Sequence, residues 1–457
     1  MSMHTPFPFL SRRDLLQRST CGFGWLAFTG LCAEAAAAEQ NPTAVKPSHF
    51  APRAKRVIFL AMRGAPSQMD LFDYKPKLQQ VADKPSEVQG RKFVGSSWSF
   101  KQHGQSGQWI SELMPHLTKH ADDLCVIKSM RTDDATHTAG FVQLHTGSAR
   151  FVRPSIGSWV LYGLGSVNEN LPGFITISPT LQFGGVQNYG CAFLPAVYQG
   201  TPITDLVRAN EGIENITNRA LPREVQRKQL DLVQSLNRQA VQRNPENSQL
   251  ESVIQSYELA FRMQVELPKV MDFATETKAT RDLYGIDNPA CDKFARQCLL
   301  ARRLAESGVR FIEVMDEDWD HHFNLTEDLP RRCRAVDQPI AALLADLKQR
   351  DLLKDTLVVW GGEFGRTPDN DRPNGRNHNN TAFTMWMAGG GVRPGLSYGE
   401  TDDFSYKVVS NEVHIHDLHA TILHLLGLDH KKLTYRHAGR DFRLTDVYGR
   451  VVKDIVA

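Results

Sequence analysis

Acidic and imidazole side chains that suit a metal ion occur in short polar segments next to apolar runs of this chain. Mixed carboxylate and imidazole donors favour a divalent ion such as zinc, manganese or calcium. Such an ion polarises a phosphoryl or sulfuryl oxygen and lowers the pKa of a water or hydroxyl bound to it. The candidate metal ligands are Asp70, Asp320, His322, Glu363 and His378.

A guanidinium accompanies these donors. Arg366 follows Glu363 in the run Glu-Phe-Gly-Arg-Thr-Pro, and it offers a bidentate donor to a tetrahedral oxyanion. A purely structural interpretation competes with this one: Glu363 pairs with Arg366 and His378 caps a loop. For Asp70, capping of a turn or helix is as good an explanation as metal binding. The sequence therefore leaves both a catalytic and a structural role open for these residues.

The elements that must position these side chains alternate between strand and helix. Apolar runs predict strands at 57–62, 125–130, 309–315, 356–360 and 383–388, and helical spacing predicts helices at 111–124, 337–350 and 415–426. Strand, helix, strand is the pattern of a parallel sheet. Since ligands bind beyond the carboxyl ends of such strands, the polar segments are expected to meet at one edge. Residues 222–307 have helical periodicity and are expected to pack beside this single sheet.

Five motifs occur in order along the chain. They are 57–60 with 64–76 (Val-Ile-Phe-Leu, then Gly-Ala-Pro-Ser-Gln-Met-Asp-Leu-Phe-Asp-Tyr-Lys-Pro), Trp-Asp-His-His at 319–322, Glu-Phe-Gly-Arg-Thr-Pro at 363–368, Gly-Arg-Asn-His at 375–378 and Asp-Leu-His-Ala-Thr at 417–421. With them the chain resembles the domain-of-unknown-function 1501 family of the alkaline phosphatase/sulfatase superfamily, over about residues 55–428. The resemblance implies an α/β, alkaline-phosphatase-like fold: a mostly parallel central sheet flanked by helices, with metal ligands on loops at the strand ends.

The resemblance also implies roles for individual residues. Asp70, with Asp73 as the rival, stands at the position of the first-strand metal carboxylate. Asp320 and His322 match the spaced Asp and His ligands of the superfamily, and His378 matches its late His ligand.

The chain departs from the family and superfamily patterns at several positions, among them Arg63 and Ala65 of the opening motif and the pair at 363–364. Glu363 stands where an Asp-His pair is usual, and Phe364 cannot replace that imidazole. The superfamily's nucleophile follows the second strand, where Thr138, then Thr136, are the candidates. The chain has no C-x-P-x-R signature, so formylglycine chemistry is unsupported.

The N-terminal residues have the three parts of an export signal. Arg12 and Arg13 precede a short apolar stretch at 21–33, and small residues at 33–38 suit a signal peptidase. We expect a twin-arginine signal peptide at 1–38, a linker at 39–54 and one folded domain at 55–457. A membrane anchor is the alternative, but the apolar stretch is short and contains glycines. The mature chain is expected in the periplasm or outside the cell, delivered by the twin-arginine export machinery.

The composition of the chain limits which classes of partner it is expected to bind. The 53 basic and 51 acidic side chains give a net charge of +2, which offers no argument for nucleic acid as a partner. No segment after the leader is apolar enough to span a membrane. Cys125, Cys191, Cys291, Cys298 and Cys333 form no C-x-x-C pair, which favours buried free thiols.

Two functions from different classes follow. The first is an exported metal-dependent hydrolase of a phosphate or sulfate ester, with Asp70, Asp320, His322, Glu363 and His378 around the metal and Thr138 and Arg366 in catalysis. Its substrate is a small-molecule or polymeric ester. The alternative is a secreted binding or assembly protein that keeps the scaffold without turnover.

Overall fold

A computed structural model describes residues 41–204, 216, 220–243, 248–370 and 372–457. The predicted signal peptide at 1–38 lies outside the described residues. In the part of the chain that is described, one nine-stranded sheet forms the centre of the molecule. Its strands are β1 (Arg56–Met62), β4 (Leu124–Arg131), β5 (Phe174–Ile177), β6 (Thr201–Ile203), β7 (Phe311–Asp316), β8 (Thr356–Gly361), β11 (Phe383–Ala388), β12 (Leu396–Tyr398) and β15 (Val413–His414).

The sheet is mixed but mostly parallel. The strand order is β12-β4-β11-β8-β1-β7-β5-β6, and β15 pairs with β4. β1 pairs in parallel with both β7 and β8, whereas β11 runs antiparallel to β4 and β8. The N-terminal end of β11 therefore lies at the same edge as the C-terminal ends of its neighbours. This arrangement confirms the α/β class expected from the sequence.

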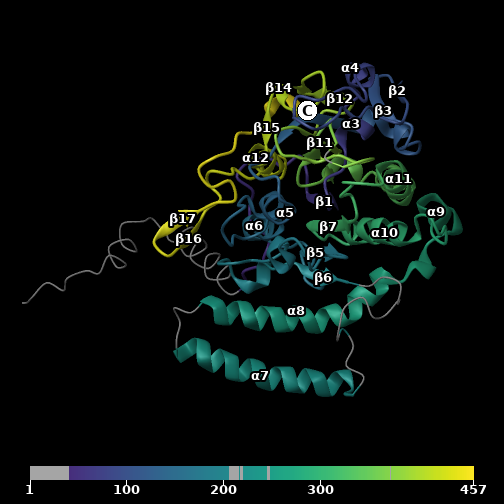
Figure 1. Ribbon diagram of the computed structural model, residues 1–457. Coiled ribbons are helices and arrows are strands. Elements are labelled where there is room, and N and C mark those ends of the chain that lie inside the picture. The colour runs from purple at the N-terminus through teal and green to yellow at the C-terminus, as the bar shows by residue number, and fades with distance from the viewer. Residues whose placement is uncertain (1–40, 205–215, 217–219, 244–247, 371) are drawn as a thin grey trace, which may run out of the picture.

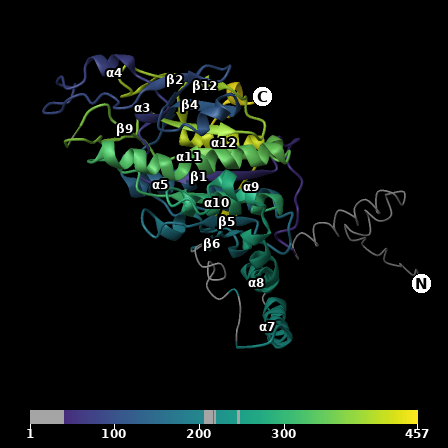
Figure 2. The same ribbon diagram turned by 90° about the vertical axis from the view of Figure 1, so that its right-hand side faces the viewer.

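Helices cover both faces of the sheet (Figures 1 and 2). Alternate residues of β1 face opposite cores: Ile58 and Leu60 belong to the core under α10 and α11, and Val57 and Phe59 belong to the core under α5, α6 and α12. Period-two alternation does not appear in the sequence of β1 because both of its faces are buried. The covering helices are α5 (His137–Thr146), α6 (Ile156–Leu164), α9 (Lys278–Tyr284), α10 (Asp292–Glu306), α11 (Leu325–Gln349) and α12 (Ile415–Leu425).

Two further helices lie beyond the β6 edge of the sheet. These are α7 (Arg223–Arg243) and α8 (Ser248–Met271), which Figure 1 shows side by side below the body of the molecule. α8 contacts the short 3-10 turn Ala196–Tyr198 and α10, and α7 packs against α8. No described helix combines the length and the apolar character that crossing a bilayer requires.

Smaller elements lie outside the central sheet. They are the short helices α3 (Gln68–Leu71) and α4 (Pro76–Gln80), and the strand pairs β2 (Phe100–His103) with β3 (Gln108–Ser111), β9 (Gly365–Arg366) with β10 (His378–Asn379), β13 (Glu400–Thr401) with β14 (Val408–Ser410), and β16 (Tyr435–His437) with β17 (Arg440–Phe442). The described cysteines are buried and free, as the sequence predicted.

One predicted element is wrong. The expected helix at 111–124 is instead the end of β3 at Ser111, a turn, and a 3-10 helix at Leu117–Asp123. Pro115 explains the difference, because a proline disfavours helical backbone at the residue before it and has no N–H to donate. The helix expected at 337–350 begins earlier, at Leu325, and contains both Pro330 and Pro339.

Candidate metal centre

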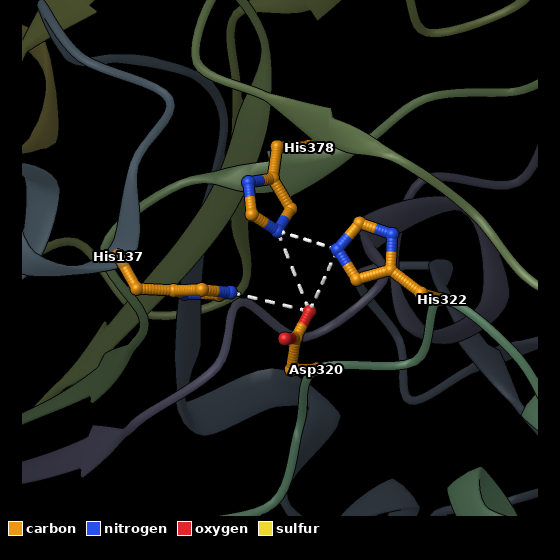
Figure 3. Close-up of side chains that lie close together, drawn as sticks. All are labelled: His137, Asp320, His322 and His378. Carbon is orange, nitrogen blue, oxygen red and sulfur yellow. Dashed lines mark hydrogen bonds and ion pairs between the residues drawn. The ribbon is translucent and has the colours of Figure 1, made fainter. Parts of the chain in front are cut away.

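Four side chains from three loops converge at the edge where the parallel strands end. His137 begins α5 after β4, Asp320 and His322 follow β7, and His378 lies in β10 just before β11. One donor atom from each lies within 4.8 Å of the others (Figure 3). The sheet brings these residues together because β11 runs antiparallel, so that its entry loop joins the C-terminal ends of β4 and β7.

The donor atoms are the three Nε2 nitrogens and Asp320 Oδ1. Asp320 Oδ1 lies 3.2 Å from the Nε2 of His137, 3.2 Å from that of His322 and 3.4 Å from that of His378. The Nε2 atoms of His322 and His378 are 2.8 Å apart. A tetrahedral zinc ion with donors about 2.0–2.2 Å away places those donors about 3.3–3.6 Å from one another. The Asp320 contacts of 3.2–3.4 Å approach this spacing, the His322–His378 contact of 2.8 Å is shorter than it, and the Asp and His donor types suit a single divalent ion.

Hydrogen bonds on the far side of two rings set which nitrogen faces the cluster. The Nδ1–H of His137 donates to Glu363 Oε1 at 2.6 Å, and that of His378 donates to the Ala135 carbonyl at 2.6 Å. A neutral imidazole that donates through Nδ1 keeps a lone pair on Nε2. Both Nε2 atoms are thus prepared as ligands, with the partners that orient them already in place.

The charges of the cluster are coupled. Burial raises the pKa of Asp320, but its interactions with the His137 and His378 rings and with Arg366 outweigh burial and hold that pKa well below its usual range. Burial lowers the pKa of His137, yet its interactions with Asp320 and Glu363 raise it overall. The Asp320 side chain is 40% exposed, against 10% for His137, so Asp320 faces solvent.

Gly64 contacts the backbone of Asp320 and the side chain of Glu363. Its N–H donates to Glu363 Oε1 at 3.0 Å, and its carbonyl accepts from Arg366. Its φ is +110°, and a Cβ there would lie 2.7 Å from the backbone nitrogen of Asp320. Only glycine fits a position that combines this backbone conformation with such a close approach.

Arg366 lies beneath the cluster with only 1% of its surface exposed. Its guanidinium donates to Asp320 Oδ1 at 2.6 Å and to the Ala65 carbonyl at 2.9 Å. In this geometry it holds Asp320 in place. Its predicted contact with an oxyanion stays a prediction, since the donors named here are directed at protein oxygens.

The residues predicted from sequence fall into two groups. The structure brings Asp320, His322 and His378 into the cluster, and it places Glu363 behind His137, as the acceptor of a ring N–H. Asp70 lies elsewhere: both of its oxygens accept from the Arg376 guanidinium, at 2.7 and 3.0 Å, and both side chains are fully buried.

Thr138 is exposed at the second position of α5, directly after His137. Its hydroxyl is therefore available to solvent beside the cluster, and its role as nucleophile remains a prediction.

His137 is the cluster residue that sequence reasoning missed. It stands in the run Thr-His-Thr just after a predicted strand, where the two threonine hydroxyls were the predicted nucleophile candidates. Its position was the available signal, because an imidazole at a strand end is a ligand candidate like the others. His321 also lies next to the cluster, but it is buried, and neither ring nitrogen has a hydrogen-bond partner among the residues that the structure describes; burial lowers its pKa to about 4.

The fold and the cluster define an α/β protein with a candidate metal centre at the strand ends of a mostly parallel sheet. The chain belongs to the family described as protein of unknown function (DUF1501), whose model matches residues 54–456. This match confirms the family resemblance drawn from the five motifs. No curated protein matches the chain in sequence.

Solved structures give distant matches. The lipoteichoic acid synthase LtaP from Listeria monocytogenes is 10% identical, with 90% of this chain and 80% of that chain covered and a TM-score of 0.36. The alkaline phosphatase from the Antarctic bacterium TAB5 is 12% identical, with 82% and 98% covered and a TM-score of 0.33. A protein in the alkaline phosphatase superfamily from Vibrio parahaemolyticus is 11% identical, with 87% and 74% covered and a TM-score of 0.37. Likeness at this level carries no argument about activity.

Proposed function

We propose that this protein is an exported, metal-dependent hydrolase of phosphate or sulfate esters. The observation that carries the proposal is the convergence of three imidazole Nε2 atoms on Asp320 Oδ1 at 3.2–3.4 Å. Lone pairs at this spacing, on an edge of the sheet where ligands bind in α/β proteins, favour a metal centre over a purely structural cluster. Twin-arginine residues in the leader support export.

A divalent cation supplies Lewis-acid polarisation of a phosphoryl or sulfuryl oxygen. His137, Asp320, His322 and His378 would hold that cation. Glu363 and the Ala135 carbonyl keep the Nδ1 protons of two of these rings and thereby keep their Nε2 lone pairs aimed inward. Thr138, exposed beside His137, is the protein hydroxyl available for attack.

A second candidate function rests on the number of donors. Four protein ligands complete a tetrahedron around zinc, which is the closed coordination typical of structural sites, whereas catalytic zinc keeps one position open. A closed site favours the alternative, a secreted binding protein without turnover. Asp320 favours the open form, since it is the most exposed of the four and its Oδ1 already accepts from Arg366.

Metal analysis of purified protein and of His378→Ala tests the metal centre. Under the proposal, wild type binds about one divalent ion per chain and His378→Ala binds it at least about tenfold more weakly while remaining folded. Hydrolysis of p-nitrophenyl phosphate or p-nitrophenyl sulfate by the metal-loaded wild type, lost in the variant, supports the hydrolase. Bound metal without turnover of either ester supports the binding protein, and unchanged metal content in His378→Ala rejects the site.

A further inference from the structure

A second cavity lies apart from the metal centre. It is an open groove of about 890 Å³ between the C-terminal end of α5 with its following loop (146–153) and the segment 442–450, with the start of α12 at its side. None of the four candidate metal ligands is among the described residues that line it. Its size lies in the range of ligand-binding sites. The groove is therefore a separate candidate for binding.

The groove has positive charge that the protein does not neutralise. Every carboxylate lining it is already paired: Asp133 with His414, Glu412 with Arg131, Asp417 with Arg450 and Asp446 with Arg440. Three lining arginines, Arg150, Arg153 and Arg443, have no carboxylate within ion-pair distance in the described part of the chain. An anionic ligand supplies the missing partner.

Arg153 is held in a defined orientation. Its guanidinium carbon lies 5.1 Å from the centre of the Phe151 ring and 4.6 Å from that of Phe442. Its Nη1 donates to the Val152 carbonyl at 3.4 Å, and the aromatic rings attract the guanidinium without using its other N–H groups, which can donate to an oxyanion. Burial also lowers the pKa of Arg153, and the attraction of Asp446 offsets that effect only in part.

Exposed aromatic rings border the groove on both sides. Phe151 is 63% exposed on one side, and Tyr448 is 63% exposed on the other. The Tyr448 ring is stacked on His416, with centroids 5.2 Å apart. Large rings left in water next to unpaired arginines indicate a ligand with flat, partly apolar faces as well as anionic groups.

We propose that this groove binds a sulfated or phosphorylated carbohydrate chain. Arg153 binds an oxyanion of that chain through its N–H edge, Arg150 and Arg443 add charge, and Phe151 and Tyr448 contact the sugar rings. Sulfate and phosphate esters present the same tetrahedral oxyanion to a guanidinium, so both belong to the proposal. The inference does not depend on the proposed hydrolase, because it concerns binding by residues outside the metal centre.

Calorimetric titration of the full mature protein with dextran sulfate and with phosphorylated dextran tests the proposal. Neutral dextran shows whether the oxyanion is required. We expect binding to at least one of the two anionic dextrans and none to neutral dextran, and comparing the two anionic polymers tells sulfate from phosphate. Failure to bind either one overturns the proposal. So does equal affinity for single-stranded DNA of the same charge, which would make the groove a general polyanion site.

Two arginines provide a matched pair of variants. Arg153→Gln is expected to weaken binding by about tenfold, the loss of one charge-assisted bidentate contact. Arg436→Gln removes the same charge from an exposed arginine that is paired with Asp441, and neither of these two residues lines the groove. We expect that control to stay within about threefold. Equal losses in both variants overturn the proposal.

Two further variants keep the result interpretable. Arg153→Lys keeps the charge but loses the planar fork, and it is expected to bind severalfold more weakly than wild type. If Arg153→Lys binds like wild type, the oriented guanidinium is not the determinant and the proposal fails. His378→Ala is expected to bind the anionic dextran like wild type, so a loss of ester hydrolysis in that variant is distinguishable from a failure of the groove.

Discussion

Glu363 accepts the Nδ1–H of His137 at 2.6 Å, although the sequence had suggested Glu363 itself as a metal ligand. The carboxylate is fully buried, and it also accepts the N–H of Gly64 at 3.0 Å. It therefore acts through the imidazole: it determines which ring nitrogen carries the proton and makes the other a better donor.

Glu363→Gln tests this relationship. Removing the charge behind His137 is expected to weaken zinc binding about 10- to 100-fold, the usual effect of losing such an orienting partner. The measurement is a competitive zinc titration against a chelating dye. Glu400→Gln, an exposed position outside the site, is the control and should match wild type. Zinc affinity that is the same in both variants would show that Glu363 does not orient a ligand.

Metal should stabilise the fold through the same cluster. At a zinc concentration about 100 times the dissociation constant, binding to the native state alone raises the free energy of unfolding by about 2.7 kcal/mol. Urea unfolding with and without a chelator measures this increment. His322→Ala should show a clearly smaller increment, because it lacks one of the four donors; binding that is tenfold weaker leaves about 1.4 kcal/mol at the same zinc concentration. A full zinc increment in that variant would place the ion elsewhere.

Replacement of Asp70, which pairs with Arg376, is expected to change the stability of the fold but not metal binding. Both side chains are fully buried, so Asp70→Asn leaves the guanidinium uncompensated and should lower the free energy of unfolding by about 3–5 kcal/mol. Bound metal per folded chain should stay unchanged, since Asp70 lies outside the cluster. A specific loss of metal, with stability retained, would restore Asp70 as a ligand.

His145 and Glu313 predict a dependence of stability on pH. Burial lowers the pKa of His145, but the Glu313 carboxylate, 2.7 Å from its Nε2, raises that pKa above the ordinary value of 6.5. Because the native state holds the proton more tightly than the unfolded chain, the pair's contribution is complete below about pH 6.5 and is lost as pH rises through the raised pKa.

Chemical unfolding across this range, in chelator, gives the measurement. In Glu313→Gln the extra stability at low pH should disappear, and the cost of breaking the buried pair is about 3–5 kcal/mol at pH 6. A difference between wild type and variant that does not change with pH would contradict the assignment.

Export is testable independently of the fold. Replacing Arg12 and Arg13 by lysine should leave the precursor in the cytoplasm, because the twin-arginine pair is the feature that identifies the route. Fractionation followed by immunoblotting measures the outcome. Replacement of Arg53 and Arg56, which lie after the predicted leader, is the control for charge removal. Unimpaired export of the double lysine variant would reject the route.

Local sequence determined most of the elements and three of the four cluster residues. Buried runs such as 383–388 match their strands, since an apolar stretch of that length has few other stable conformations. Asp320, His322 and His378 could be identified because each stands next to such a run. The one misassigned helix, at 111–124, failed where Pro115 outweighed the periodicity.

Tertiary structure decided what each polar side chain does. Spacing along the chain cannot tell that Glu363 faces His137, that Asp70 faces Arg376, or that Arg153 contacts the Phe442 ring, because each partner is distant in sequence. The antiparallel direction of β11 is equally invisible in its apolar residues, yet it brings His378 to the ends of β4 and β7. The residue type tells which chemistry a side chain is capable of. Its partner depends on which distant segments the tertiary structure brings next to it.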